Sequence, residues 1–305
     1  MPLGVTVPRS GTPPSMTSSS MATTMLWYAR RRRRRQMTDH FRFVHITDTH
    51  IMAGGAWRMR GTDVDFDTDA SLRRVVDTVR RLDPAPAFAV LGGDLTSPDL
   101  LHRDRVLEPT EYASSYMRLK EILAGLPCPA HYLMGNHDNL EAFNRALRPQ
   151  AAKDAPAYYG FDHGGMHFVA LDSHEPGHAD GMLDAAQFAW LERDLAARRA
   201  AATIVFVHHH PWPLGHAWMD TMQLRNGADL MSLLGRHAQV RWLIGGHVHS
   251  EQVIQRGALT MLTTPSTCIQ LAKVGGPVHF EPGPPGFRVV DVDDGRLSSY
   301  VVYVR

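Results

Sequence analysis

Cysteine is scarce in this chain, with only Cys128 and Cys268 among 305 residues. The two lie far apart in the sequence and match no metal-ligand spacing, which excludes a disulfide-rich scaffold and a thiolate zinc site. Unpaired cysteines behave as small apolar side chains and are among the most buried residue types. We therefore expect both to be buried free thiols in a cytoplasmic protein.

Long hydrophobic runs are also missing. A membrane-spanning helix needs roughly 18 or more consecutive apolar residues, and no stretch of the chain approaches that length. An export signal places an apolar segment after its positive charges, whereas here Gln36, Met37 and a polar stretch follow Arg30 to Arg35. The sequence therefore predicts no membrane span and no secretory or twin-arginine signal, and it favours a cytoplasmic location.

Acidic residues are absent from residues 1–36, which carry seven arginines at Arg9 and Arg30 to Arg35. Because the whole chain has a net charge of +1 and this segment +7, the remainder is near −6. A mildly acidic domain is not expected to bind nucleic acid. We predict a disordered, Arg-rich leader over 1–36, arising from a start codon upstream of Met37, and one domain over 37–305. The alternative is that the arginine run alone binds nucleic acid or anionic lipid.

Hydrophobic residues are plentiful, at 44% of the chain, and from residue 41 onward they form short aliphatic runs. Such runs, bounded by turn residues, are typical of buried strands. Five of them stop abruptly at a cluster of Asp, His, Asn or Gly. In chain order they are Phe41 to Thr47 before Asp48-Thr49-His50, Ala87 to Leu91 before Gly92-Gly93-Asp94, Ala130 to Met134 before Gly135-Asn136-His137-Asp138, Thr203 to Val207 before His208-His209-His210-Pro211, and Val240 to Ile244 before Gly245-Gly246-His247-Val248-His249.

Helical patterns lie between several of these strands, at residues 69–82 with Asp69 as the expected N-cap, at 112–124 and at 185–199. Alternation of strands and helices indicates an α/β domain with an at least partly parallel sheet. Ligands of such sheets gather at the carboxyl ends of the strands. All five polar clusters stand at those ends, which predicts a site there.

The rest of the chain adds strands but no internal repeat and no second domain. The turn signal Asp293-Asp294-Gly295 predicts an antiparallel hairpin. Residues 272–286 are rich in Gly and Pro and are expected to form a loop. The additional strands are expected at Met166 to Leu171, Val253 to Gln255, Leu259 to Thr263, Phe287 to Val292 and Ser298 to Val304.

The polar clusters contain two pairs with a spacing of two residues, Asp48 with His50 and His247 with His249. Residues i and i+2 of an extended strand point the same way, so each pair can offer two ligands to one side. The carboxylate of Asp94 can bridge two cations. Nitrogen and oxygen donors without thiolate suit Zn, Mn, Fe or Co.

Seven ligands, one of them shared, make two sets of four. Two neighbouring ions held by such sets are the usual arrangement for displacement at phosphorus. We expect Asp94 to be the shared ligand. The first set is Asp48, His50, Asp94 and His249; the second is Asp94, Asn136, His208 and His247.

The ordered series Asp-x-His, Gly-Asp, Gly-Asn-His-Asp, His and Gly-His-x-His, from Asp48 to His249, resembles the calcineurin-like metallophosphoesterases. The resemblance implies a four-layer α/β/β/α sandwich with a dinuclear metal centre between the sheets. It also implies that the ligand in the histidine triplet is the first one, His208. His210 stays open as the rival, because side chains two apart face the same side.

A finer resemblance is to the bacterial class III cyclic-nucleotide phosphodiesterases and covers about residues 40–305. Bacterial glycerophosphodiesterases look similar as far as His249 and less so afterwards. The segments that carry the finer match are His208-His209-His210-Pro211-Trp212-Pro213, Leu224-Arg225-Asn226, Thr264-Pro265-Ser266-Thr267-Cys268-Ile269-Gln270 and Pro282 to Val292.

The expected chemistry is attack of a metal-bridging hydroxide on a phosphodiester, with proton delivery to the leaving alkoxide. The resemblance makes His137, which faces the phosphate in the family, the candidate acid, with Asp138 orienting it. The alternative for His137 is phosphate positioning without proton transfer. The residues expected to contact substrate are His50, Asp94, Asn136, His137 and His249.

The predicted activity is hydrolysis of 3′,5′-cyclic AMP, or a related cyclic nucleotide, to the 5′-monophosphate. The alternatives are a broad-range glycerophosphodiester phosphodiesterase and a scaffold without activity. A protein Ser/Thr phosphatase is disfavoured because Leu95-Thr96-Ser97-Pro98 replaces that family's Asp-Arg-Gly element after Asp94. The oligomeric state is left open, and related enzymes are often dimers or larger.

Five further residues are weaker candidates for the site. Trp212 and His216 follow the histidine triplet and could line the substrate pocket, and by resemblance Asn226 could contact the base or sugar. His174 and His178 follow a strand end, but a surface loop is the favoured interpretation for both.

Overall fold

The structure is a computed structural model that describes residues 40–305 except 55, 59–64, 103, 217 and 272–279. The predicted leader over 1–36 lies outside the described residues, as does most of the loop predicted over 272–286. The description that follows concerns the part of the chain from residue 40 onward.

One sheet has five strands in the order β15-β14-β1-β4-β5. Strand β1 lies in the middle, parallel to β4 and antiparallel to β14, while β5 is parallel to β4 and β15 antiparallel to β14. The hairpin of β14 and β15 turns at Asp294 and Gly295, which both have positive φ, as a tight turn between two strands requires. The bounds are β1 (Phe41–Ile46), β4 (Phe88–Gly92), β5 (Ala130–Leu133), β14 (Gly286–Asp293) and β15 (Arg296–Tyr303).

The other large sheet has six strands in the order β10-β11-β9-β8-β7-β6. Its four inner strands are mutually parallel, and the two edge strands run antiparallel to them. The bounds are β6 (Tyr159–His163), β7 (Met166–Ala170), β8 (Thr203–Phe206), β9 (Val240–Gly245), β10 (Gln252–Arg256) and β11 (Leu259–Thr263).

The two sheets pack face to face through an aromatic core. Phe43 and Phe88 of the five-stranded sheet stack with ring centroids 5.0 Å apart, and Phe43 meets Phe168 and Phe206 of the six-stranded sheet edge-on at 5.8 and 6.1 Å. All four side chains are at most 1% exposed. Burial of this many large apolar side chains is the main free-energy gain that holds the sheets together.

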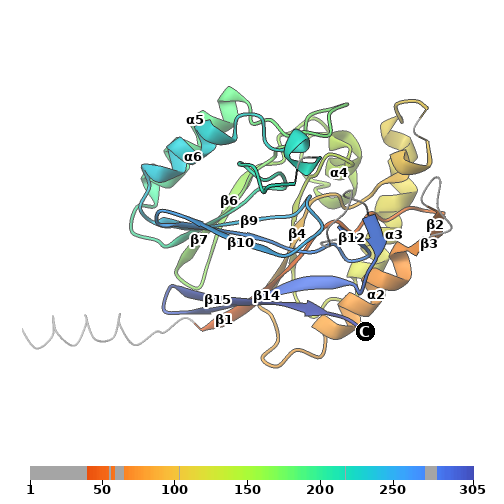
Figure 1. The fold of residues 1–305 in the computed structure, drawn as a ribbon, viewed down its shortest axis with the longest axis horizontal. Coiled ribbons are helices and arrows are strands. Elements are labelled where there is room, and N and C mark those ends of the chain that lie inside the picture. Colours follow the sequence, from red (N-terminus) through yellow and green to blue (C-terminus); the bar gives the residue numbers. More distant parts are fainter. Residues whose placement is uncertain (1–39, 55, 59–64, 103, 217, 272–279) are drawn as a thin grey trace, which may run out of the picture. The chain divides into compact units, whose positions relative to one another are not determined.

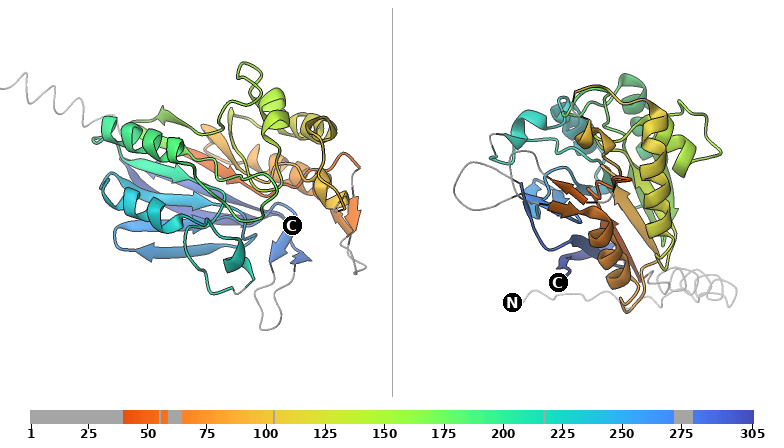
Figure 2. Two further views of the ribbon diagram at one scale, coloured as in Figure 1. Left: turned by 90° about the horizontal axis from the view of Figure 1, so that it is seen from above. Right: turned by 90° about the vertical axis from the view of Figure 1, so that its right-hand side faces the viewer.

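Helices cover the outer face of each sheet, as Figures 1 and 2 show. Helices α2 (Thr68–Val79), α3 (Ala113–Leu123) and α4 (Leu140–Leu147) share a buried cluster with the five-stranded sheet, and α5 (Ala185–Ala197) and α6 (Gly227–Gly235) share one with the six-stranded sheet. The four-layer α/β/β/α sandwich predicted from the sequence is therefore confirmed. Of the helices that the structure describes, none is long and apolar enough to cross a membrane.

Short elements lie in the connections. The two-stranded ribbons are β2 (Ala56–Arg58) with β3 (Asp65–Asp67) and β12 (Ile269–Leu271) with β13 (Phe280–Pro282). The 3-10 helices are η1 (Pro98–Leu101), η2 (Pro109–Tyr112) and η3 (Met219–Met222). Strand β13 falls within the segment that the sequence analysis expected to be a loop, and it forms because β12 gives it a partner.

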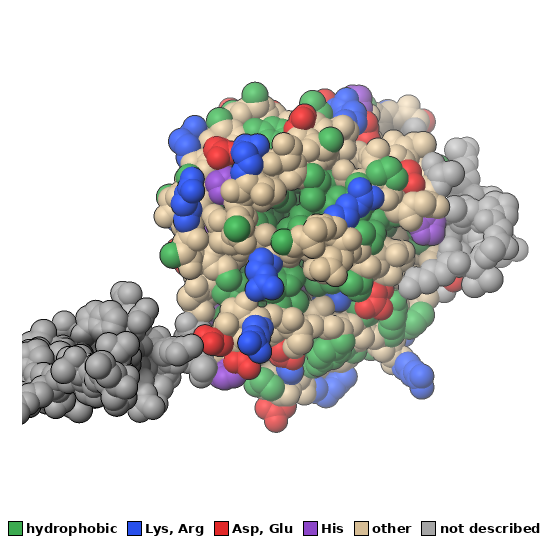
Figure 3. Space-filling model, turned by 60° about the vertical axis from the view of Figure 1, so that its left-hand side comes forward, with side chains coloured by type: hydrophobic (Ala, Val, Ile, Leu, Met, Phe, Trp, Pro, Cys, Tyr) green, Lys and Arg blue, Asp and Glu red, His purple; other side chains and the backbone are tan. Residues whose placement is uncertain are grey.

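One further detail, at the start of α2, differs from the expectations. Asp67, not Asp69, caps α2, because its carboxylate accepts a hydrogen bond from the backbone N–H of Ala70 at 2.9 Å. On the face of the molecule drawn in Figure 3, Lys and Arg side chains are scattered among polar ones, and hydrophobic side chains gather in the middle.

Candidate metal centre and its pockets

The predicted ligands come together where the carboxyl ends of strands from both sheets meet. Asp48 and His50 follow β1, Asp94 follows β4 and Asn136 follows β5 in one sheet, while His208 follows β8 and the pair His247 and His249 follows β9 in the other. Six of them are at most 5% exposed, the exception being the half-buried Asn136. Two isolated strand-like pairings tie the loops together, Thr47 with Ser266 and Ile51 with Thr96.

The backbone at this site is unusual. Among the described residues, six non-glycine residues have positive φ; five are predicted ligands, and the sixth is Asp294 of the hairpin turn. A left-handed conformation is costly for a side chain with a Cβ and persists only where the surroundings enforce it. Its concentration here indicates a functional site. The five ligands are Asp48, His50, Asp94, His247 and His249, with φ between 45° and 68°.

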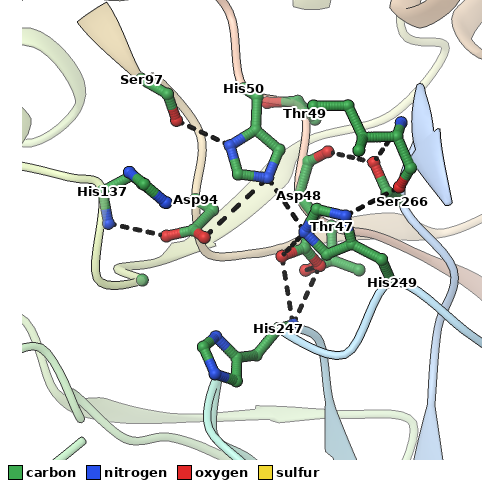
Figure 4. A network of polar contacts seen from close by, with 12 residues as sticks. Thr47, Asp48, Thr49, His50, Asp94, Ser97, His137, His247, His249 and Ser266 are labelled. Atoms are coloured by element: carbon green, nitrogen blue, oxygen red, sulfur yellow. Dashed lines mark hydrogen bonds and ion pairs between the residues drawn. The ribbon is translucent and has the colours of Figure 1, made fainter. Parts of the chain in front are cut away.

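The first predicted set of ligands, Asp48, His50, Asp94 and His249, forms a cluster whose ligand atoms all lie within 4.8 Å of one another. Figure 4 shows the four side chains converging. His50 Nε2 lies 3.1 Å from His249 Nε2, and His249 Nε2 lies 3.2 Å from Asp48 Oδ1. Nitrogen lone pairs so close to each other and to a carboxylate suit a shared cation.

The second predicted set contains polar atoms with no partner. Asn136 Oδ1, His208 Nε2 and His247 Nε2 are buried without a hydrogen bond, although such atoms are normally satisfied. The carboxylate of Asp94 reaches both sets, because its Oδ2 lies 3.4 Å from His208 Nε2 and 3.9 Å from His50 Nε2. A cation held by these atoms would satisfy all of them. The donor set therefore fits a second divalent ion with Asp94 shared.

Hydrogen bonds to the far side of three imidazoles fix the direction of the ligand nitrogen, as in many metal sites. His208 Nδ1–H donates to the Gly92 carbonyl at 2.8 Å, and His249 Nδ1–H donates to the Ile269 carbonyl at 2.7 Å. His50 Nδ1 lies 2.7 Å from Ser97 Oγ. On each ring Nε2 is therefore the nitrogen that faces the carboxylate of Asp48 or Asp94.

The structure adds His209 to the expected choice between His208 and His210 in the histidine triplet. The ring that joins His208 and His247 in a cluster is that of His209. Both nitrogens of His209 are already engaged, Nδ1 with Ser173 Oγ at 2.7 Å and Nε2 with the Ala179 carbonyl at 3.2 Å. His210 Nε2 is also without a hydrogen bond, but it lies 3.6 Å from Asp220 and belongs to neither cluster of potential metal ligands. His208, with its unpartnered Nε2 beside Asp94, is the member of the triplet that fits a ligand.

Electrostatics at the site favour bound positive charge. Burial lowers the pKa of His50 to about 3, so its imidazole is neutral and able to coordinate. Burial alone would raise the pKa of Asp94, but the neighbouring His208 and His137 hold it well below its usual range. Asp94 is thus an anion in a low-dielectric environment, where a cation is strongly attracted.

Close backbone approach explains the glycines of the strand-end clusters. A Cβ on Gly135 would lie 2.2 Å from Asp94 Oδ1, and one on Gly246 would lie 2.1 Å from Thr47 Oγ1. Neither distance is tolerated between unbonded atoms. Glycine is therefore required for the ligand loops to pack against one another.

His137 stands beside the ligands at the edge of the site, with its side chain 24% exposed. Its backbone N–H donates to Asp94 Oδ1 at 2.9 Å, which is drawn in Figure 4. Its Nδ1–H donates to Asp99 Oδ2 at 2.7 Å. Burial would lower the pKa of His137, but the carboxylates of Asp94 and Asp99 outweigh it and raise the pKa to about 9.

Asp138 does not hold the imidazole of His137, contrary to the expectation from the sequence; Asp99 does. The Asp138 carboxylate accepts the hydroxyl hydrogen of Tyr116 at 2.7 Å and the backbone N–H groups of Leu95, Thr96 and Gly135 at 3.0 to 3.2 Å. It therefore ties the loop after β4 to the loop after β5. Asp99 was missed because it lies on η1, five residues after Asp94, with no pattern to mark it.

Ser266 has a role that the family signature around it did not reveal. Its hydroxyl donates to the backbone carbonyl of Asp48 at 2.7 Å and accepts from the N–H groups of Cys268 and Ile269 at 3.1 Å. Figure 4 shows it beside Asp48. The segment Thr264 to Gln270 thus helps to fix the conformation of the first ligand loop.

Two cavities open from the site on either side of His137 and Asp99. The first, of about 670 Å³, is called the apolar pocket; it reaches five of the predicted ligands and has an apolar wall. The wall residues are Trp57, Leu100, Trp218, Met219, Met222 and Ile269. The second, of about 630 Å³, is called the charged pocket. Its charged or titratable lining outside the site is Arg105, Tyr112, Glu141, Lys153, Asp154, His174 and His178, of which Arg105 also lines the apolar pocket.

The weaker sequence candidates are distributed differently from the expectations. Trp212 is buried against the core under α5 and α6 and lines neither pocket. Asn226 is hydrogen-bonded to both backbone groups of Leu183 and stands at the N-cap position of α6 without a side-chain capping bond, so it holds a loop. His174 and His178 lie in the loop after β7, as expected, with His178 exposed, and they line the charged pocket. His216 lines neither pocket.

Comparison with known proteins agrees with this geometry. The family model described as calcineurin-like phosphoesterase matches residues 41–251. The 3′,5′-cyclic adenosine monophosphate phosphodiesterase CpdA of Pseudomonas aeruginosa is 34% identical over 257 residues, which cover 84% of this chain and 87% of that protein. The glycerophosphodiester phosphodiesterase GpdQ of Enterobacter lignolyticus is 31% identical over 231 residues, covering 74% of this chain and 77% of that protein.

A solved structure supports the fold. A dimetal phosphatase from Danio rerio superposes with a TM-score of 0.62 at 15% identity and covers 87% of this chain and 99% of that one. At this identity the likeness concerns the architecture alone. With the family model spanning every predicted ligand, the chain belongs to the calcineurin-like phosphoesterase family.

Proposed function

We propose that this metal-dependent phosphodiesterase hydrolyses 3′,5′-cyclic AMP, or a related cyclic nucleotide, to the 5′-monophosphate. The observation that carries the proposal is the metal cluster of Asp48, His50, Asp94 and His249, beside which three unpartnered atoms mark a second site. The substrate class is supported by the 34% identity to a cyclic adenosine monophosphate phosphodiesterase over most of both chains.

The two metal sites would be held by the two sets described above, with Asp94 shared. Divalent ions of the Fe, Mn, Zn or Co type, when bound, neutralise phosphate charge and make water a nucleophile near neutral pH. We assign contact with the phosphate to Asn136 and His137, together with the ligand side chains His50, Asp94 and His249. All five line the apolar pocket, and Asn136 and His137 also line the charged pocket.

His137 is the proposed acid. Hydrolysis forms a bond between water oxygen and phosphorus, breaks the bond between phosphorus and the 3′ oxygen, and leaves an alkoxide that needs a proton. The Nδ1–H of His137 is committed to Asp99, so Nε2–H is the group that can donate to the 3′ oxygen. Asp99 is then a positioning residue, and Asp138 keeps the loop of Asn136 and His137 in place.

The second candidate is hydrolysis of glycerophosphodiesters, which the relationship to GpdQ favours. The charged pocket supports it, because Lys153 and Glu141 could meet the polar ends of such a substrate. The metal ligands are the same for both activities. The pocket walls, not the metal centre, therefore decide between them.

Two expectations from the sequence accompany the proposal, a cytoplasmic location and assembly into a homodimer or larger homo-oligomer. Cell fractionation tests the first. Light scattering on the purified chain tests the second, and a mass of one chain would contradict it.

A substrate panel on metal-reconstituted protein tests the activity. The panel contains cyclic AMP, a 2′,3′-cyclic nucleotide, glycerophosphoethanolamine and a simple phosphomonoester. We expect the highest kcat/KM for cyclic AMP. Poor turnover of cyclic AMP beside good turnover of another diester would reject the assignment, and activity that survives complete removal of metal would reject the metal sites.

A further inference from the structure

The apolar pocket has two walls that belong to different small hydrophobic clusters. Trp57, Leu100 and Ile269 belong to one cluster together with Met52, Phe66 and Cys268. Met219 and Met222 belong to another together with Val248 and Leu271, and Val248 stands between the ligands His247 and His249. Each wall is thus the exposed end of a packed cluster. Such walls keep their shape when no ligand is present.

The first wall presents a rigid aromatic ring. Trp57 is only 7% exposed and stacks on Phe66, with ring centroids 5.4 Å apart and planes 27° from parallel. The methionines Met219 and Met222 of the second wall are flexible and polarisable, which suits contact with an aromatic face. A slot with an aromatic ring and aliphatic side chains on one side and thioethers on the other favours a flat apolar ring.

The floor of the apolar pocket is the metal centre itself. His50, Asp94, His247 and His249 line this pocket and are absent from the lining of the charged pocket. Asn136 and His137 border both. A ligand with its phosphate on the metal ligands therefore extends directly between the two apolar walls.

The charged pocket is a poor alternative for a flat ring. Lys153 and Glu141, which line the charged pocket and not the apolar one, lie 3.5 Å apart. Covering these groups with an aromatic ring would remove water from charges without replacing its hydrogen bonds, which is costly. Its lining suits the polar part of a substrate.

We propose that the apolar pocket between Trp57, Leu100 and Ile269 on one side and Met219 and Met222 on the other receives the nucleobase. This inference rests on the proposed function and names its specificity-determining walls. At about 670 Å³ the cavity has the size of ordinary small-molecule sites. A glycerol or ethanolamine group would leave the walls in contact with water, so the walls select nucleotides over glycerophosphodiesters.

The test changes one residue in each wall to a polar side chain of similar length. Leu100 and Met222 are both only partly buried, so Leu100→Gln and Met222→Gln are expected to fold. Each should lower the ratio of kcat/KM for cyclic AMP to kcat/KM for glycerophosphoethanolamine by about tenfold, as loss of apolar contact in a pocket does. Met117→Gln is the matched control, since Met117 is 71% exposed on α3 and lines neither pocket.

Product binding provides the second measurement. Wild-type enzyme should be inhibited more strongly by 5′-AMP than by ribose 5-phosphate, and Met222→Gln should reduce the difference. Equal inhibition by the two compounds in the wild type, or a substrate ratio that Leu100→Gln and Met222→Gln leave at the value of Met117→Gln, would overturn the inference.

Failure of the proposed function is distinguishable from failure of the base pocket. If cyclic AMP is not hydrolysed but another diester is, the proposed function fails. Inhibition of that other reaction by 5′-AMP and ribose 5-phosphate then still decides whether a base occupies the pocket.

Discussion

The imidazole of His137 is held by Asp99, whose Oδ2 lies 2.7 Å from His137 Nδ1. The two residues come from different loops, one after β5 and one on η1 after β4. Their contact leaves His137 Nε2 as the nitrogen available to substrate, next to the shared ligand Asp94. Asp99 is therefore a positioning residue, and the effect of replacing it on activity can be predicted.

Replacement of Asp99 by Asn should lower kcat on cyclic AMP about 10- to 100-fold, because a mispositioned or deprotonated imidazole is a poorer acid. His137→Ala should cost more. Neither should change the number of metal ions per chain. The decisive comparison uses a diester with a 4-nitrophenolate leaving group, which needs no proton, and on it both variants should lose much less.

Asp77→Asn is the control for Asp99→Asn. Asp77 on α2 is exposed, and its carboxylate only approaches the side chain of Arg80, at 4.0 Å. Equal losses on the two kinds of leaving group would show that Asp99 and His137 act on phosphate binding, not on proton transfer.

Asp138 is predicted to be essential for stability as well as for activity. Its replacement by Ala would leave three backbone N–H groups and the Tyr116 hydroxyl without an acceptor, at a cost of about 3 kcal/mol or more in the free energy of unfolding. Tyr116→Phe removes one of these bonds and should cost about 1–2 kcal/mol. Urea denaturation measures both.

The exposed Asp77→Ala serves as control and should change stability by less than about 0.5 kcal/mol. If Asp138→Ala unfolded at the same urea concentration as the wild type, the carboxylate would not be the link between the two loops.

The strands, and the strand-end positions of the predicted ligands, could be predicted because they depend on a local pattern. Each ligand cluster follows a short apolar run, and the carboxyl ends of parallel strands meet at one edge. Helix α6 escaped prediction because it begins at Gly227 and ends at Gly235, and glycine disfavours helix. Gly227 is needed there because a Cβ would lie 2.0 Å from the Pro211 carbonyl oxygen, which is a tertiary constraint.

The parts of the site that could not be predicted depend on contacts between distant segments. Asp99 meets His137 across 38 positions of sequence, and Ser266 meets the backbone of Asp48 across 218. The segments that carry the finer resemblance contain Ile269, but not the other wall residues of the apolar pocket, Trp57, Leu100, Met219 and Met222. Asp138 was expected to orient His137 and is its neighbour in the sequence, but adjacent side chains point in different directions.

Metal content should follow the two ligand sets. Metal-reconstituted wild-type protein should hold two divalent ions per chain by elemental analysis after gel filtration. His249→Ala and His247→Ala should each retain about one, because they belong to different sets. Added metal should also raise the unfolding temperature of the wild type, since ions that bind only the folded state stabilise it.

His210→Ala separates the two candidates in the histidine triplet. It should keep two ions per chain, whereas His208→Ala should lose one. A loss of one ion from His210→Ala with His208→Ala unaffected would assign the ligand to His210.

Asp172, remote from the metal ligands in sequence, gives a prediction for stability against pH. Burial raises the pKa of its carboxyl from its ordinary value to about 6. A carboxyl whose pKa is higher in the folded state contributes stability that is complete below its unfolded pKa, near 3.9, and is lost as pH rises through the folded value. Asp172→Asn should therefore remove a stability change of about 2 kcal/mol between pH 4 and pH 7. Thermal or urea unfolding of both proteins across this range measures it, with Asp229→Asn on α6 as control, and parallel profiles for wild type and Asp172→Asn would contradict the assignment.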